Sequence, residues 1–415
     1  MKIFKLFFFI MLLLLIVNGF ITEIEYCQQL QYYFIFPLIV VMLVQQFFSN
    51  IRIRKTFFNG LKKHWSILLL LLYFSIHMIF TAVDTRDFVG AVKIIIAFIN
   101  TLILPFLIYL LSFLYISSEL KGDIYELLKK IRRYVIFAVI LVIPGFIQSI
   151  QELGEGAEFA KNIAIFCFIF FIPFILLIRT KWNYVFFCFI LIALLLTSKR
   201  GAITGMVIPY FIVVFFDPST PKFKKVLLFL LPIFITIILA VSFPKNTEVV
   251  YGRFAKENEL ENVESFGSSR GDIWAVHLIR FSSGTSQQQL FGFGFGSSYD
   301  LTEKFSIRRV SAHNVYIGIG YQFGIIGLSL YVIFLLYLLF QARIAFKKNY
   351  IYSKLILYTV LVVIITGFSE VHFETYYIIY PFFFLGIMIG LMNNKKYNRI
   401  LEINNNHKHL GLLAT

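Results

Sequence analysis

Residues 89–116 read VGAVKIIIAFINTLILPFLIYLLSFLYI, a run whose only charged side chain is Lys93. A bilayer core about 30 Å thick is crossed by roughly 20 apolar residues in helical form. This run exceeds that length and shows no polar face of the kind that a helix at the surface of a soluble domain carries. It therefore predicts a transmembrane helix.

Comparable apolar stretches recur along almost the whole chain and predict about twelve spans. The N-terminal one begins like a signal peptide but lacks a small-residue cleavage site, so we interpret it as the first span. The polar knot TSKRG separates the seventh and eighth spans so narrowly that a pair of re-entrant or broken helices is an alternative there. The stretches lie near residues 4–21, 31–48, 65–83, 89–116, 134–150, 162–178, 183–198, 201–216, 226–243, 313–341, 355–369 and 376–392.

The composition agrees with one membrane domain and excludes a soluble one. Of the 415 residues, 59% are hydrophobic and 14% are charged, far from the usage of soluble globular domains. We predict an all-α polytopic membrane domain over residues 1–393 and a polar tail over residues 394–415. The three cysteines show no CxxC spacing, and no histidine pair has metal-ligand spacing, so neither disulfides nor a metal site are predicted.

The net charge of +16 reflects membrane topology rather than nucleic-acid binding, because the basic residues are scattered over short connections. Positive residues resist translocation, so the basic connections predict the cytoplasmic face. The alternate connections are acidic and predict the outer face. The basic connections contain Arg52, Arg54, Lys55, Lys62 and Lys63; Lys121, Lys129, Lys130, Arg132 and Arg133; Lys222, Lys224 and Lys225; and Arg343, Lys347 and Lys348. The acidic ones contain Glu23 and Glu25; Asp84 and Asp87; Glu152, Glu155 and Glu158; and Glu370 and Glu374.

By the same alternation both termini are predicted to be cytoplasmic, and the single long connection, residues 244–312, faces outward. Long connections on a rigid scaffold often carry function. Lys199 and Arg200 stand at the outer end of a span, against the charge trend. Charges at a membrane edge usually face a cavity or a partner, so these two predict an anion site, and snorkelling to lipid headgroups is the alternative.

Two motifs lie in the long connection. In SSRGDIWAVHLIR, residues 268–280, the apolar spacing predicts a short interfacial amphipathic helix with Arg270 near its N-terminus, where backbone N–H groups favour a phosphate. A solvated surface charge is the alternative for Arg270. The motif LFGFGFGSS, residues 290–298, lacks the sequence and context of a nucleotide-binding loop and predicts tight turns against the membrane surface.

The segment HNVYIGIGYQFGIIGL, residues 313–328, places His313 and Asn314 at the outer mouth of a predicted span. Histidine titrates near neutral pH and serves as a general base, typically contributing about 10² to 10⁴ in rate. A purely structural role is the alternative for a lone histidine. His313 is therefore a candidate catalytic residue.

The ordered set TSKRGA, SSRGDIW in a long outer connection, LFGFGFG, and HN followed by Gly324 resembles the O-antigen ligase and polysaccharide polymerase superfamily. The resemblance spans residues 195–330 and implies a fold like that of the GT-C membrane glycosyltransferases. It implies a bacterial inner-membrane enzyme that transfers a glycan from undecaprenyl diphosphate on the outer face, with no cofactor or metal. Thr204 departs from the pattern, because ligases often have Leu there.

The resemblance also implies residue roles and partners. Arg200 and Arg270 correspond to diphosphate binders, and His313 to the residue that orients or deprotonates the acceptor hydroxyl. Lys199, Asn314 and Glu370 are further predicted substrate-binding residues. The acceptor is a lipid-linked repeat unit or a lipid A core glycan, and a flippase and a chain-length regulator of the same pathway are expected partners, besides membrane lipids; nucleic acid is not.

The resemblance and the number of predicted spans leave three possible functions. The leading one is a polymerase of O-antigen, capsule or exopolysaccharide repeat units, and the second is a ligase that passes finished glycan to lipid A core in lipopolysaccharide synthesis. A transporter of lipid-linked sugars is the alternative from another class, since about twelve spans suit it equally. The single long outer connection and the rim position of the charges favour an enzyme.

Overall fold

The computed structural model of the chain describes residues 59–62, 64–84, 88–118, 200–216, 270–304, 311–347, 352–368 and 378–394, with single positions at 41 and between 221 and 234. All regular structure in these ranges is helical, without a strand. Three stretches are long and apolar enough to cross a membrane, namely Trp65–Asp84, Gly90–Ser117 and Val315–Lys347. The all-α class is thus confirmed for the described part of the chain.

The described helices outside the long connection coincide with predicted spans. Three shorter apolar helices, Ile203–Phe216, Ser353–Thr366 and Pro381–Asn393, fall where further spans are predicted. The other predicted spans lie largely outside the described residues, so the total of about twelve stays a prediction. These helices are α4 (Trp65–Asp84), α5 (Phe88–Phe98), α6 (Leu104–Ser118), α10 (Arg200–Phe216), α16 (Val315–Lys347), α17 (Ser353–Thr366) and α18 (Ile379–Asn393).

A π-helical turn, Ile99–Ile103, joins α5 to α6 in one continuous stretch. The N–H of Leu104 donates to the carbonyl of Ile99, five residues earlier. The next residue, Pro105, has no N–H and would crowd the carbonyl four residues before it in a regular helix. The wider turn accommodates this proline without breaking the span.

Helices α6 and α18 approach closely along a pair of glycines. A Cβ at Gly390 would lie 3.0 Å from the carbonyl oxygen of Phe113, and one at Gly386 would lie 2.8 Å from the Cβ of Ser112. Small residues four positions apart let membrane helices come into backbone contact. At the end of this interface the amide of Asn394 donates to the carbonyl of Ile116 at 2.9 Å.

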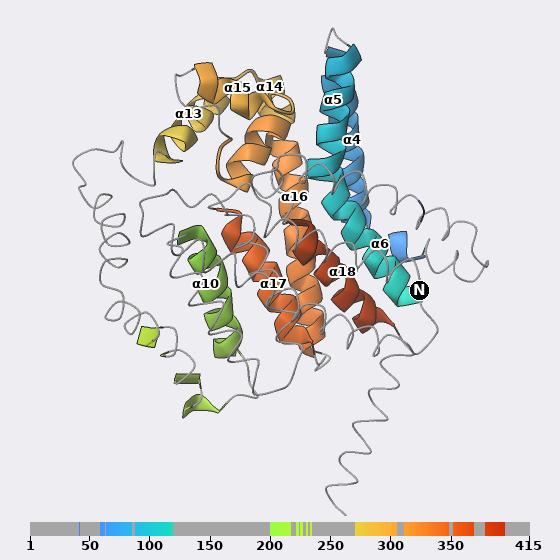
Figure 1. Ribbon diagram of the computed structural model, residues 1–415, viewed down its shortest axis with the longest axis vertical. Coiled ribbons are helices and arrows are strands. Elements are labelled where there is room, and N and C mark those ends of the chain that lie inside the picture. The colour runs from blue at the N-terminus through green and yellow to red at the C-terminus, as the bar shows by residue number, and fades with distance from the viewer. Residues whose placement is uncertain are drawn as a thin grey trace, which may run out of the picture.

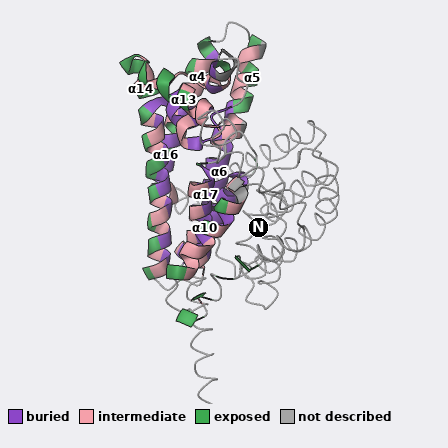
Figure 2. Cartoon of the chain, turned by 90° about the vertical axis from the view of Figure 1, so that its left-hand side faces the viewer, coloured by how far each residue is buried: buried purple, intermediate pink, exposed green. Residues whose placement is uncertain are grey.

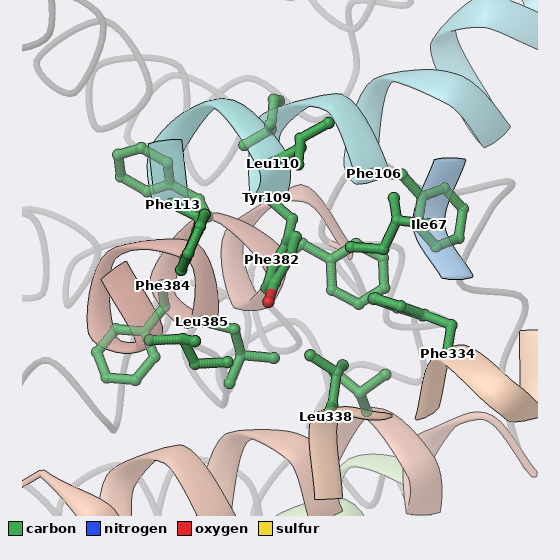
Figure 3. Close-up of a cluster of buried hydrophobic side chains, with 14 of the residues drawn as sticks. Ile67, Phe106, Tyr109, Leu110, Phe113, Phe334, Leu338, Phe382, Phe384 and Leu385 are labelled. Atoms are coloured by element: carbon green, nitrogen blue, oxygen red, sulfur yellow. The ribbon is translucent and has the colours of Figure 1, made fainter. Parts of the chain in front are cut away.

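Aromatic side chains join α16 to this pair (Figure 3). The ring of Phe334 lies 5.2 Å from that of Phe106 and 5.5 Å from that of Phe382, in edge-to-face arrangements. Edge-to-face pairs contribute about 0.5–1.5 kcal/mol beyond the area they bury. The core of the described bundle therefore lies between α6, α16 and α18.

Helix α16 reverses direction at Gly324, whose φ of 69° and ψ of −174° are not helical. The rings of Tyr316 and Tyr331 lie 6.1 Å apart, although fifteen residues of straight helix would separate them by about 22 Å. The helix is thus a short arm, residues 315–323, folded back on a long arm, residues 325–347 (Figure 1). The prediction of one uninterrupted span over 313–341 is corrected here, because the left-handed glycine ends the first helix. The long arm alone extends about 34 Å.

The tight turns predicted for LFGFGFGSS are present and cap the short arm. We call residues 292–296 the glycine turn; they connect α14 (Ser286–Phe291) with α15 (Ser297–Lys304). The N–H groups of Phe293 and Gly294 donate to the carbonyls of Tyr321 and Gln322, each at 3.0 Å. The final carbonyls of a helix have no hydrogen-bond donors within the helix. The N–H groups of the glycine turn are the donors for the short arm.

Two further contacts complete this cap. The hydroxyl of Tyr73 on α4 donates to the carbonyl of Phe323 at 2.7 Å. Backbone of the two segments is so close that a Cβ at Gly292 would overlap Gln322, and one at Gly324 would overlap Leu290. The reversal at Gly324 and the glycine turn therefore require each other.

The long connection forms a helical layer at one end of the bundle. Helices α13 (Arg270–Ser282), α14 and α15 lie at the end where α4 finishes and α5 begins (Figures 1 and 2). A short helix is present where one is predicted near residues 268–280, as α13, and its position at the membrane interface stays a prediction. The charge alternation predicts that the connection between α4 and α5 and the long connection lie on the same side of the membrane, and the structure places the described parts of both at the same end of the bundle. That this end is the outer face stays a prediction.

We expect Gly324→Ala to destabilise the protein by more than about 2 kcal/mol. The left-handed backbone costs an L side chain roughly 1–2 kcal/mol, and overpacking against Leu290 adds about 1–3 kcal/mol. Gly318→Ala on the same arm is the control, because its Cβ would meet nothing closer than 3.9 Å. Thermal unfolding of both variants in detergent measures the effect, and equal melting temperatures would contradict the steric role of Gly324.

Candidate functional site

His313 lies in the segment that leads into the short arm of α16, with a strained backbone. Its φ is 46°, the only positive φ of a non-glycine residue among those described. Such conformations cost about 1–3 kcal/mol and cluster at functional sites. Its Nδ1 atom is buried and has no hydrogen-bond partner within the described ranges. A buried imidazole nitrogen without a partner is uncommon in a folded protein and marks His313 as a candidate functional residue.

Asn314 fixes the position of His313. Its side-chain oxygen accepts from the N–H groups of Tyr316 and Ile317 at 2.9 and 3.1 Å, which makes it the N-cap of the short arm. Its side-chain amide donates to the carbonyl of Phe368, just beyond α17, at 3.2 Å. Asn314 is buried, and these contacts engage both ends of its amide group.

Helix α13 places Arg270 near His313. The indole N–H of Trp274 donates to the carbonyl of Ala312 at 2.7 Å, next to His313. Arg270 precedes Trp274 by four residues and so shares its face of the helix. The guanidinium of Arg270 acts electrostatically on His313. The structure therefore places two of the predicted site residues together.

A buried histidine fastens α13 to α15 and to the short arm. The Nδ1–H of His277 donates to the carbonyl of Ile273 at 2.6 Å, and its Nε2 accepts from the hydroxyl of Ser298 at 2.7 Å. Its ring meets that of Tyr321 edge to face at 5.0 Å. Burial lowers the pKa of His277, which keeps it in the neutral form that this arrangement needs.

The start of α10 and the end of α17 lie near residues 313–315, which lead into the short arm. The N–H of Val315 donates to the carbonyl of Gly367 at 2.8 Å. One residue earlier, the side chain of Thr366 leaves no room for a Cβ at Gly205 on α10. Arg200 begins α10 five residues before Gly205, or about 7.5 Å along the axis. Its backbone therefore belongs to this junction, whereas Lys199 and Glu370 lie outside the described residues.

The charge state of His313 follows from its surroundings. Burial, and secondarily the positive charge of Arg270, lower its pKa from 6.5 to about 4. The imidazole is therefore neutral at physiological pH, as a proton acceptor must be. We refer to Arg200, Arg270 and His313 with the backbone around them as the junction site.

Sequence reasoning did not anticipate three positioning residues at this site. Trp274 could have been found from its spacing of four from Arg270, which puts both on one helix face. His277 and Tyr73 offered no such signal, because the partners that define their roles, Ser298 and Phe323, lie far away in the sequence. Within the described part of the chain no cluster of three or more His, Cys, Asp or Glu side chains has the geometry to hold a metal ion.

These features define a helical membrane protein in which the candidate residues Arg270 and His313 lie at one end of the bundle, beneath a layer of short helices. Residues 184–332 match the family model described as O-Antigen ligase. This match confirms the predicted resemblance to the O-antigen ligase and polymerase superfamily over residues 184–332. The matched segment includes Arg200, Arg270 and His313 but not Glu370. A comparison with curated proteins finds no match to the chain.

We expect His313 to remain neutral down to about pH 4, with Arg270→Gln raising its pKa while burial still holds it below 6.5. The unfolded chain titrates near 6.5, so the contribution of neutral His313 to stability is complete above pH 6.5 and is lost as the pH falls towards 4. Nitrogen NMR of labelled histidines, assigned with His313→Gln, measures this titration. Arg280→Gln, which removes the same charge ten residues further along α13, should leave the titration unchanged; a wild-type pKa near 6.5 would refute the buried setting.

Proposed function

We propose that the protein is a glycosyltransferase of the outer face of the bacterial inner membrane. It moves a glycan from undecaprenyl diphosphate to a sugar hydroxyl, and it polymerises repeat units of O-antigen, capsule or exopolysaccharide. The observation that carries the proposal is the positive charge of Arg270 acting on the buried imidazole of His313, whose Nδ1 has no hydrogen-bond partner among the described residues. The family match supports the same chemistry.

The reaction requires a leaving group, a nucleophile and a place for one proton. The acceptor hydroxyl attacks the anomeric carbon, and the electron pair of the breaking C–O bond passes to the diphosphate oxygen. The hydroxyl proton passes to the imidazole of His313. Because the lipid diphosphate is already activated, the step needs no nucleotide outside the cytoplasm.

The cations of the junction site would hold the diphosphate. We propose that Arg270 and Arg200 bind its oxygens, since a guanidinium stays charged and grips phosphate in a bidentate manner. The N-terminus of α10 at Arg200 adds backbone N–H groups that favour an anion. Lys199 and Glu370 are proposed to line the same region, and Asn314 to act through His313 by holding the segment in place.

A ligase that passes finished glycan to lipid A core is the second candidate, because the matched family model is described as O-Antigen ligase. The two functions share the donor and the chemical step and differ in the acceptor. We further propose a single membrane domain over residues 1–393, with both termini in the cytoplasm and a cytoplasmic tail after it.

We expect His313→Ala to reduce glycan transfer by about 10² to 10⁴, because the general base is lost. Cells with the intact gene, a deletion and this variant at equal level are compared by surface-glycan gels and by mass spectrometry of lipid-linked glycans. Single surface repeats without long chains identify a polymerase, and polymer stranded on the carrier identifies a ligase.

The same comparison exposes the wrong class of function. Normal chains in the variant would remove His313 from the mechanism. Unflipped precursor on the cytoplasmic face would identify a transporter instead. An unchanged melting temperature of the purified variant ensures that lost transfer is not lost folding.

We expect Arg270→Gln to lower the transfer rate about 10² to 10³-fold, the usual cost of one electrostatic stabiliser of the transition state. Arg270→Lys should restore part of the rate, since it keeps the charge but loses the bidentate geometry. The measurement is transfer by purified enzyme in vesicles with lipid-linked donor. Arg280→Gln is the matched control on the same helix, and an equal loss in that variant would show that overall charge, not the junction site, controls the rate.

A further inference from the structure

The outward face of α13 is apolar, although the helix belongs to the long connection and not to a span. Ala275, Leu278, Ile279 and Ser282 are exposed and spaced as one face of the helix. Arg280 is exposed as well, but it follows buried Ile273 by seven residues and so lies on the other side of the helix. Leu278 is 54% exposed and Ile279 is 67% exposed. The opposite face packs inward through buried Ile273 and His277. A helix in contact with water would carry charged or polar residues on its outward face.

Helix α14 continues this surface. Leu290 and Phe291 at its end are each 45% exposed. The side-chain amide of Gln289 donates to the carbonyl of Ser282 at the end of α13 at 3.0 Å, so the two helices form one layer. We call Leu278, Ile279, Leu290 and Phe291 the apolar surface. Exposed apolar groups of this kind mark a surface that another molecule covers.

The position of α13 and α14 relative to the ends of the membrane-spanning helices indicates what covers the apolar surface. Helix α4 is long and apolar enough to span a membrane, and it keeps Phe80 and Val83 exposed near its end, at 70% and 78%. Phe88 at the start of α5 is 82% exposed. The two views share a vertical axis, and in both α13 and α14 lie at the height of the upper part of α4 and α5, near these helix ends (Figures 1 and 2).

The end of a span marks the edge of the bilayer, so the apolar surface lies close to that edge. Lys93 on α5 is exposed near the same end, where its long stem can carry the ammonium group to lipid headgroups. We infer that the apolar surface docks into the lipid bilayer at the boundary between headgroups and acyl chains. The layer that carries Arg270 is thus itself held by lipid.

Site-specific fluorescence tests this docking in the full chain. An environment-sensitive dye is attached to single cysteines at Ile279 or Leu290, after Cys27, Cys167 and Cys188 are replaced, in vesicles of phosphatidylethanolamine and phosphatidylglycerol. Gln287→Cys, exposed on α14, is the control for a watery position, and Phe80→Cys is the reference for a lipid-facing one. Quenching by lipids with nitroxide-labelled acyl chains is compared with quenching by aqueous iodide.

We expect the dye at 279 and 290 to emit at shorter wavelength and to be quenched by the nitroxide lipids as at position 80, with little quenching by iodide. The dye at 287 should show the reverse. Iodide quenching at 279 equal to that at 287 would overturn the inference, since the surface would then face water. Protection from both quenchers would overturn it as well, because protein from this chain or a second copy would then cover the surface. The readout involves no catalysis, so it stands apart from the proposed function.

Discussion

The structure depends on one constraint, the reversal of the chain at Gly324. A helix that stops inside a packed bundle leaves its last carbonyls without partners, and each unsatisfied group in an apolar setting costs several kcal/mol. Here the N–H groups of the glycine turn and the hydroxyl of Tyr73 supply those partners from two distant segments. The reversal can form only when the long connection and α4 are both in place. It therefore ties a segment outside the spans to the spans themselves.

The geometry of the junction site follows from this reversal. Folding the short arm back returns its N-terminus to the level of Tyr331 and the end of α17, where Gly367 and Phe368 accept its hydrogen bonds. Had α16 continued straight, His313 would stand about 16 Å beyond Gly324 and far from α17. Trp274 and His277 then fasten α13 over the returned segment. The strained φ of His313 is sustained because its neighbours on both sides are held by hydrogen bonds.

The sequence predicts much of this fold, for reasons that are local. Apolar length identifies α4, α16 and the α5–α6 stretch, and spacing identifies α13, because each signal resides in one continuous segment. The tight turns at residues 292–296 follow from the glycines. The reversal at Gly324 could not be predicted from the glycines, because glycine is common inside membrane helices. Only the close approach to Leu290 shows at which glycine the chain reverses. The role of Asn314 as an N-cap was equally hidden, since it depends on a helix start within a longer apolar run.

On the proposed function, the position of Arg270 near His313 would make proton transfer depend on the bound donor. Both groups are basic, and the charge of Arg270 adds to burial in lowering the pKa of the imidazole. That arrangement keeps His313 neutral but also makes it a weak base. A diphosphate bound to Arg270 would cancel the repulsion and add negative charge nearby, and both changes raise the proton affinity of His313. On the proposed function, the base would thus gain strength only when the leaving group is in place, which couples deprotonation of the acceptor to occupancy by the lipid-linked donor.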